Sequence, residues 1–259
     1  MPRRAREKSE TGIYHIMIRG ANRQEIFHDD KDRFRFLETL KKAKLTSEAQ
    51  VYGWRLMNNH VHLLLKEGNE EISITMKRLG VSYVWYYNQK YKTTGHLFQD
   101  RFKSEKVETD KYLLTVLRYI HQNPVKAQLV KSVEQWQWSS CLGYYGNKVY
   151  PESLLDKALI LKMFSEDERE AREKFKQFNE QESNDSCLDD ITHEKVKLSD
   201  DEARLEVLKV ISGIEIAQVK SLPKKERDPI LQKVKKIENI TQRQAARIFG
   251  ISPSLIFKA

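Results

Sequence analysis

The stretch MNNHVHLLL, residues 57–65, sets the expectations for the rest of the chain. It is apolar and rich in branched residues, which predicts a strand buried on at least one face. Successive side chains of a strand alternate between its faces, so His60 and His62 should point to the same side, about 7 Å apart along the backbone. Neutral imidazole is a common metal ligand, and this pair therefore suggests a metal site. A hydrogen-bonded, half-buried pair without a metal fits the same stretch equally well.

The composition describes a heavily charged chain that can still bury a core. Its 259 residues are 39% hydrophobic and 32% charged, and a chain of this length holds one or two domains. No apolar stretch approaches the roughly 18 residues of a membrane span. The basic N-terminus has no apolar segment behind it that would mark a secretory signal. Cys141 and Cys187 match no zinc or redox spacing. We therefore expect a soluble, cytoplasmic protein with no membrane contact and no evident protein partner.

The charge balance favours a polyanionic partner. The chain has 46 Lys and Arg residues against 37 Asp and Glu, which gives a formal net charge of +9. The calculated isoelectric point is about 9.3. A surface of this kind attracts nucleic acid and other polyanions, although net charge does not identify which one.

Strand and helix patterns alternate along the first half of the chain. Asn58 and Asn59 suit a tight turn between two strands, since Asn tolerates positive φ. Thr109 can cap the third helix, and Pro124 should stop it. The predicted strands are 12–20, 51–57, 60–65 and 105–107, and the predicted helices are 29–47, 71–91 and 110–122. This order predicts an α+β fold, namely a ferredoxin-like split βαβ antiparallel sheet with helices packed on one face.

The third predicted helix places Tyr119 and Asn123 one turn apart, on a line separate from its apolar stripe. A tyrosine hydroxyl has a free pKa of about 10 and needs a metal or a base to act as a nucleophile at neutral pH. Asn123 could add an amide oxygen to the two imidazoles. Such a set, with open positions for phosphate oxygens, suits Mg²⁺ or Mn²⁺. By spacing alone, a packing role for Tyr119 with its hydroxyl at the surface is the simpler interpretation.

Three longer motifs, together with the His60–His62 pair, resemble a known family. They are YHIMIRG at 14–20, GHLFQDRFKS at 95–104 and YIHQNPVKA at 119–127. In this order they resemble the HUH single-tyrosine transposases, and more narrowly their REP-associated tyrosine transposase branch. The resemblance covers about residues 9–146.

This resemblance implies a nuclease that acts on single-stranded DNA, often at hairpin-forming palindromes. By the same resemblance, His60 and His62 are metal ligands and Tyr119 attacks the scissile phosphate. The products would be a 5′-phosphotyrosine and a free 3′-hydroxyl, so ligation can follow without ATP. Asn123 matches the position of the family's third ligand. Gln128 departs from the pattern, because the branch commonly has glycine there, and this puts the local turn geometry in doubt.

Basic residues near these motifs are candidates for contacts with the DNA backbone, and the aromatic residues could stack unpaired bases. Any one of the basic residues could instead be a solvated surface charge. The candidates are Arg19, Arg23, Arg101, Lys103, Arg118 and Lys126.

The C-terminal stretch ITQRQAARIFGISPSLI, residues 240–256, has a residue pattern typical of a helix-turn-helix. The residues that match it are Thr241 as a cap, Gly250 in the turn, Ser252 as the second cap and Pro253 at the first helical position. Arg243 and Ser254 join the candidate DNA contacts. A helical hairpin without groove contact is the alternative. The recognition helix would end at Ala259, which leaves few side chains to read bases.

The sequence as a whole predicts a two-part DNA-processing protein. Residues 1–150 form the transposase domain, 151–197 a helical and acidic linker region, and 198–259 a helix-turn-helix domain. The expected function is cleavage and rejoining of single-stranded DNA through a 5′-phosphotyrosine with a divalent metal. Two alternatives stay open: a hairpin-DNA-binding protein whose catalysis has lapsed, and a metal-dependent phosphoesterase without a covalent intermediate.

Overall fold

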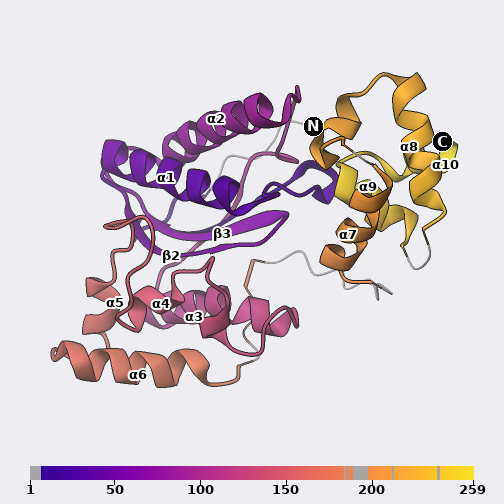
Figure 1. The fold of residues 1–259 in the computed structure, drawn as a ribbon. Coiled ribbons are helices and arrows are strands. Elements are labelled where there is room, and N and C mark those ends of the chain that lie inside the picture. The colour runs from indigo at the N-terminus through magenta and orange to yellow at the C-terminus, as the bar shows by residue number, and fades with distance from the viewer. Residues whose placement is uncertain (1–6, 184, 186, 189–197, 212, 238–239) are drawn as a thin grey trace.

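A four-stranded antiparallel sheet forms the centre of the N-terminal part in the computed structural model (Figure 1). Its strands are β1 (Ile13–Arg19), β2 (Gln50–Leu56), β3 (His60–Lys66) and β4 (Lys103–Lys106), in the order β2-β3-β1-β4. The helices α1 (Asp30–Ser47) and α2 (Ile72–Tyr91) connect β1 to β2 and β3 to β4. The helix α3 (Asp110–Lys126) follows β4. The predicted order of elements and the antiparallel sheet are therefore confirmed. The structure describes residues 7–183, 185, 187–188, 198–211, 213–237 and 240–259, so part of the predicted linker, 189–197, lies outside it.

Helices cover both faces of the sheet, and the prediction of helices on one face is wrong. One face carries Ile16 and Leu63, which pack with α1 and α2 in the main core. The other face carries Leu64, which packs with Leu117 of α3 in a second core. Figure 1 draws α1 and α2 on one side of the sheet and α3 on the other, with α4, α5 and α6 beside α3. The apolar stripe of α3 needs a buried partner, and the second face of the sheet supplies it.

All but one of the remaining elements follow α3 in the chain. They are the short helices α4 (Cys141–Tyr144), α5 (Ala158–Lys162) and α6 (Glu168–Glu180), the 3-10 helices η1 (Ala21–Arg23), η2 (Val133–Gln135) and η3 (Ile216–Ser221), and the helices α7 (Asp200–Val210), α8 (Lys224–Lys235), α9 (Gln242–Phe249) and α10 (Pro253–Lys258), of which η1 alone precedes α3. Phe175 of α6 belongs to the same core as Leu117, so residues beyond 150 pack on the sheet-containing part. The expected domain boundaries stay a prediction.

The ends of α1 and α3 follow from their caps. The Asp29 side chain accepts a hydrogen bond from the Asp32 backbone N–H, and the Asp29 backbone N–H donates one to the Asp32 side chain, which is the reciprocal capping arrangement. Thr109 caps α3 as predicted. The prediction that Pro124 stops α3 is wrong, because the helix continues to Lys126. Proline removes one backbone donor, but this loss falls in the last turn, where few helical bonds remain to be broken.

The segment after α3 explains the departure at Gln128. Gln128 has a φ of 58°, in the left-handed region that glycine adopts without steric cost. The family preference for glycine at this position thus corresponds to a backbone conformation that this chain keeps with a larger residue.

A close approach between β2 and α3 holds the helix against the sheet. A Cβ added to Gly53 would lie 2.6 Å from Leu117 Cδ1, closer than such atoms approach one another. The register of β2 against β3 shifts between Val51 and Gly53, so glycine also stands at an irregularity of the strand. A side chain at position 53 would displace the Leu117 side chain, so glycine suits this close approach of α3 to β2.

The C-terminal helices, α7 to α10, enclose a core of their own that includes Val207, Leu231 and Phe249. Thr241 caps α9 by accepting from the Gln244 backbone, as predicted. Gly250 follows α9 in the turn, also as predicted, and adopts the left-handed conformation. Ser252 precedes α10 but makes no side-chain cap, and its hydroxyl instead lies 2.8 Å from that of Ser254. The helix-turn-helix interpretation stays a prediction.

The turn after α9 packs on the loop after β1. A Cβ at Gly250 would lie 2.0 Å from Gln24 Oε1 and 2.7 Å from Gln24 Cβ. Gln24 is itself buried and holds the loop to Leu97 O through its side-chain amide. This contact joins the C-terminal helices to the sheet-containing part.

The described helices were compared with membrane-spanning helices in length and hydropathy. Over the residues that the structure describes, no helix combines the length and the apolar character that crossing a membrane requires.

Replacing Gly250 with alanine should destabilise the protein by about 2–5 kcal/mol. The left-handed conformation costs a residue with a Cβ about 1–2 kcal/mol, and overlap with Gln24 adds about 1–3 kcal/mol, the usual range for overpacking. Gly213→Ala is the matched control, since Gly213 has a φ of +80° but no described atom within 4 Å of the place that a Cβ would take. Urea unfolding followed by far-UV circular dichroism measures both variants. Equal losses would contradict the packing role of Gly250.

Candidate functional site

The candidate site lies on the sheet face that α3 covers. We call it the histidine face, and define it by His15, Arg55, His60 and His62. His62 is fully buried and His60 is half-buried, and their ring centroids are 5.2 Å apart. The strand register places Arg55 of β2 beside His62. The expectation that both β3 histidines share one side is therefore met by the backbone.

His60 is held by two polar neighbours. Its Nδ1 lies 2.6 Å from Asn59 Oδ1, and its Nε2 lies 3.4 Å from an Arg55 nitrogen. An amide oxygen can only accept, so Nδ1 carries the proton and Nε2 presents a lone pair. The turn residue Asn59 thus orients the imidazole that follows it.

His62 has one satisfied ring nitrogen and one orphan. Its Nδ1 lies 2.9 Å from His15 Nε2, whereas its Nε2 is buried and has no hydrogen-bond partner among the described residues. A buried polar nitrogen without a partner costs about 1–3 kcal/mol unless something else binds it. An orphan lone pair of this kind is what a cation ligand offers.

Burial and a neighbouring cation keep both imidazoles neutral. Desolvation, followed by the positive charge of Arg55, lowers the pKa of His60 and of His62 well below 6.5. Neutral imidazole is the form that binds metal ions. The electrostatics of the histidine face therefore favour ligation over protonation at neutral pH.

The helix α3 brings Tyr119 and Asn123 to the two histidines. The rings of Tyr119 and His62 meet edge to face with centroids 5.9 Å apart. Asn123 Nδ2 donates to the Tyr119 hydroxyl at 3.2 Å. Tyr119 is 3% exposed, so its hydroxyl is not a surface group. The structure thus brings Tyr119 beside His62 and places Asn123 against the Tyr119 hydroxyl, while the roles of these residues stay a prediction.

The described residues offer no third metal ligand of the usual carboxylate, thiolate or imidazole type beside His60 and His62. Among the described residues, no group of three or more His, Cys, Asp and Glu side chains could hold a metal ion. A ligand set here would be His60, His62 and an amide oxygen, for which Asn123 is the positioned candidate.

Sequence reasoning missed Arg55. It is fully buried on the histidine face, and its guanidinium lies over the Tyr119 ring at 5.8 Å from the centroid. A charged residue inside the otherwise apolar strand VYGWRLM was the available signal, because strand alternation puts Arg55 on the side opposite Trp54 and Leu56.

Three of the predicted DNA contacts lie at one end of β1. Arg19 ends β1 opposite His60, and Arg23 follows in η1. The loop that leads to Arg101 is bonded to this end through Gln99 N and Arg19 O at 2.9 Å. Arg101 and Lys103 are exposed and, with Phe102, line an open pocket of about 380 Å³.

The other predicted DNA contacts lie elsewhere. Arg118 pairs with Asp185 at 2.8 Å and lies over the Phe178 ring, so it binds within the protein. Lys126 is exposed, with its ammonium 5.9 Å from the Tyr119 ring centroid. Arg243 and Ser254 are exposed on α9 and α10, outside the histidine face.

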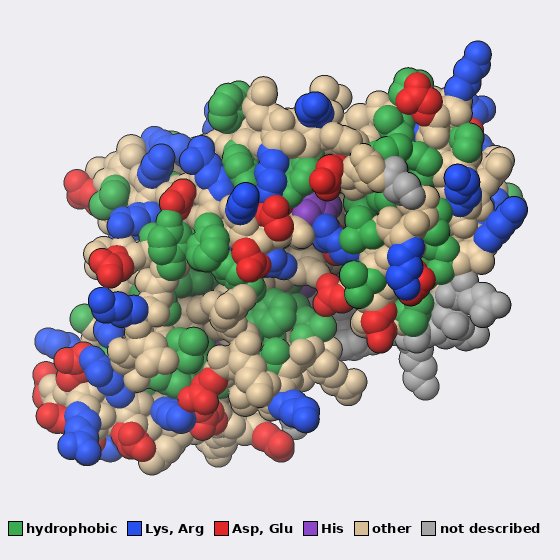
Figure 2. All heavy atoms as spheres, in the orientation of Figure 1, with side chains coloured by type: hydrophobic (Ala, Val, Ile, Leu, Met, Phe, Trp, Pro, Cys, Tyr) green, Lys and Arg blue, Asp and Glu red, His purple; other side chains and the backbone are tan. Residues whose placement is uncertain are grey.

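The surface between the two parts of the molecule is hollowed. Figure 2 shows a histidine side chain inside a hollow between the sheet-containing part and the C-terminal helices, with charged side chains of both signs near it. Lys and Arg side chains are spread over both parts on this face. The basic charge of the chain is therefore distributed and not confined to one patch of this face.

Comparison with known proteins connects this geometry to a family. Residues 8–123 match the family model described as "Transposase IS200 like". A Haemophilus influenzae protein described as a REP-associated tyrosine transposase is 29% identical over 109 residues, which are 38% of this chain and 61% of that protein. The chain thus spans less than two thirds of that relative. A solved structure of a REP-associated tyrosine transposase bound to a REP hairpin has a TM-score of 0.49 and 19% identity, and covers 58% of this chain and 89% of that one. The family and relative matches confirm the resemblance.

The two cysteines are poor candidates for an alternative nucleophile. Burial raises the pKa of Cys141 and of Cys187 to about 12. At pH 8 a thiol with this pKa is ionised to about one part in 10⁴. In a Cys187→Ser variant we expect the remaining thiol, Cys141, to stay unreactive toward a disulfide reagent such as DTNB until the protein is denatured. Rapid reaction of the folded variant would contradict this.

Proposed function

Starting from residues 8–123 as a segment similar to IS200-like transposases, we propose that the protein cleaves and rejoins single-stranded DNA through a covalent bond between Tyr119 and a 5′-phosphate. One observation carries the proposal: α3 holds the Tyr119 ring 5.9 Å from that of His62, beside the His60–His62 pair. A nucleophile next to two neutral imidazoles is the arrangement that metal-assisted phosphoryl transfer needs.

In the proposed reaction the Tyr119 oxygen attacks the phosphorus of the scissile phosphate. The new bond joins this oxygen to phosphorus, and the bond to the 3′-oxygen breaks, so the leaving strand ends in a 3′-hydroxyl after it takes up a proton. Asn123 donates to the tyrosine oxygen and so favours its deprotonated form. A returning 3′-hydroxyl reverses these steps and reseals a strand.

The residues of the histidine face fit a divalent cation, which we propose to be Mg²⁺ or Mn²⁺. The buried orphan Nε2 of His62 and the lone pair of His60 Nε2 are the imidazole ligands, and Asn123 supplies the amide oxygen. When bound, the cation would neutralise charge that develops on the phosphate oxygens. Arg55, next to His60, adds a fixed positive charge to the same location.

The substrate in this proposal is a single strand, or the foot of a hairpin. Arg19, Arg23 and Arg101 would bind phosphates at the end of β1, and Phe102 in the open pocket would stack an unpaired base. The hairpin form follows from the resemblance of the sequence motifs to the REP-associated branch. We propose further that α9 and α10 contact duplex DNA, with Arg243 and Ser254 exposed for this role. The proposal keeps the cytoplasmic location expected from the sequence.

Incubation with a labelled single-stranded hairpin and Mn²⁺ should produce a protein–DNA adduct that survives denaturing gel electrophoresis. Tyr119→Phe should abolish the adduct, because phenylalanine has no oxygen to bond to phosphorus. Tyr150→Phe is the matched control, since Tyr150 is 46% exposed and should leave the adduct unchanged. Cleavage without an adduct would favour a phosphoesterase, and hairpin binding without cleavage would favour a DNA-binding protein.

Mn²⁺ should also stabilise the folded protein without any DNA. At a hundred times its dissociation constant a ligand stabilises by about 2.7 kcal/mol, which corresponds to roughly 5–10 °C in Tm for a chain of this size. His62→Ala should lose most of this shift, whereas His96→Ala, at an exposed loop position, should keep it. Thermal melts followed by circular dichroism measure the shift in Tm for each variant. A shift that persists in His62→Ala would place the cation elsewhere.

A further inference from the structure

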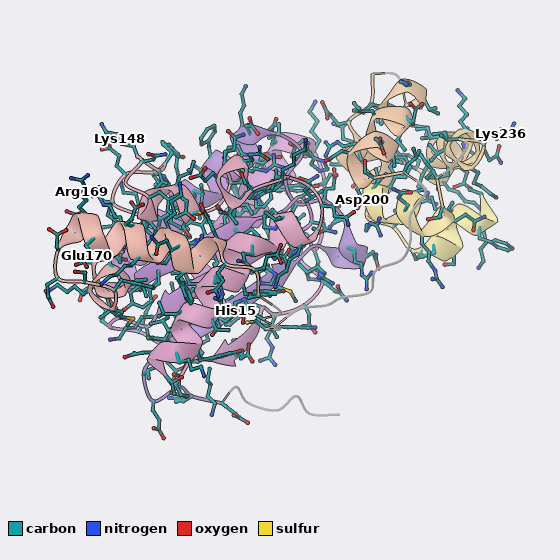
Figure 3. All side chains as sticks on the ribbon, turned by 90° about the horizontal axis from the view of Figure 1, so that it is seen from below. His15, Lys148, Arg169, Glu170, Asp200 and Lys236 are labelled. Atoms are coloured by element: carbon teal, nitrogen blue, oxygen red, sulfur yellow. The ribbon has the colours of Figure 1, made fainter. Side chains whose placement is uncertain are left out.

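His15 of β1 lies between His62 and an acidic residue of β4. It is fully buried on the histidine face, and its Nε2 lies 2.9 Å from His62 Nδ1. Its other ring nitrogen, Nδ1, lies 3.7 Å from Glu105 Oε2. The strand register pairs His15 directly with Glu105. Figure 3 labels His15 in the sheet-containing part, apart from Asp200 and Lys236 of the C-terminal helices.

Glu105 is held as a carboxylate. Its interaction with the His15 ring is the largest of the effects that lower its pKa, and a hydrogen bond with Tyr112 lowers the pKa further. The Leu188 backbone N–H also donates to Glu105 Oε2 at 3.2 Å. A carboxylate can accept hydrogen bonds but cannot donate them. Glu105 therefore presents fixed negative charge to His15.

With both rings neutral, the charge of Glu105 determines the positions of their protons in sequence. Negative charge beside His15 Nδ1 favours the tautomer with the proton on that nitrogen, because a lone pair there would be repelled. His15 Nε2 is then an acceptor, so the proton between the two rings belongs to His62 Nδ1. His62 Nε2 is left with its lone pair, and it is one of several buried side-chain atoms that have no hydrogen-bond partner among the described residues.

We propose that His15, oriented by Glu105, is a positioning residue that holds His62 in the tautomer able to bind a cation through Nε2. The opposite tautomer would place a proton on Nε2 and block ligation. This inference rests on the proposed function, in which His62 is a metal ligand. Partners that orient a metal-binding histidine in this way commonly change metal affinity 10- to 100-fold when they are removed.

The test reads the tautomer of His62 directly and then measures metal affinity. Protein with ¹⁵N-labelled histidine gives the protonation of each ring nitrogen by NMR in the metal-free state, with His62→Ala used to assign the signals. Wild type should show His62 protonated on Nδ1 and unprotonated on Nε2. Glu105→Gln replaces the carboxylate with an amide that can donate, and should shift His62 toward the Nε2-protonated form. Its Mn²⁺ affinity should fall about 10- to 100-fold.

Matched variants separate positioning from a general effect on folding. Glu108→Gln removes an acidic charge three residues further on, at an exposed position, and should leave tautomer and affinity unchanged. His15→Gln can still accept from His62 Nδ1 and should retain part of the affinity, whereas His15→Phe, with no acceptor, should lose it. Circular dichroism melts establish that each variant is folded.

Two results would overturn the proposal: a wild-type His62 that carries its proton on Nε2, or a folded Glu105→Gln variant with unchanged tautomer and Mn²⁺ affinity. A wild type that binds no Mn²⁺ would overturn the metal site in the proposed function. The tautomer of His62 in the metal-free protein would still decide whether Glu105 and His15 set it.

Discussion

The direct packing of α3 on β2 governs what the histidine face can be. At Gly53 the helix approaches the strand so closely that Leu117 occupies the space of a side chain. This approach removes water from a layer that contains His15, Arg55, His62 and Tyr119. Buried polar groups are stable when they bond to one another or to a bound ion. The geometry of the site is therefore a consequence of helix packing, and the polar side chains in it have little freedom to rearrange.

Two charges of opposite sign lie at the ends of this layer. Arg55 is a buried cation beside two imidazoles, and its charge opposes their protonation. Glu105 lies at the far end of the same row and supplies the negative charge that His15 faces. Between these two charges His60 and His62 stay neutral, with Asn59 beside Nδ1 of His60 and His15 beside Nδ1 of His62. A phosphate that approaches this layer would meet a positive guanidinium and polar nitrogens.

Local sequence patterns predicted much of the fold. Most of the features that they missed depend on packing between segments that are distant in the chain. Alternation placed His60 and His62 on one face of β3, and Thr109 capped α3, because these features depend on neighbours in the chain. The helix beyond Pro124 was missed because the proline rule takes no account of position, whereas a donor lost in the last turn of α3 removes few helical hydrogen bonds. Coverage of the second sheet face and the role of Arg55 depend on which segments meet, which one sequence does not state. The proposed ligand set of His60, His62 and Asn123 rests on residue spacing and on the family resemblance, and it stays a prediction.

The contact between Gly250 and Gln24 also makes the C-terminal helices a structural support for the loop after β1. Near that contact, Arg204 of α7 pairs with Glu25, a carboxylate that is 4% exposed, and Lys220 reaches the Gln24 side chain at 3.1 Å. If the chain ended before α7, Glu25 would lose its cation and the loop that carries Arg23 would lose the surface against which it packs. The C-terminal helices are thus part of the scaffold of the loop that carries Arg23. Cutting the chain at residue 123, where the family match ends, would remove this support from a loop that lies inside the match.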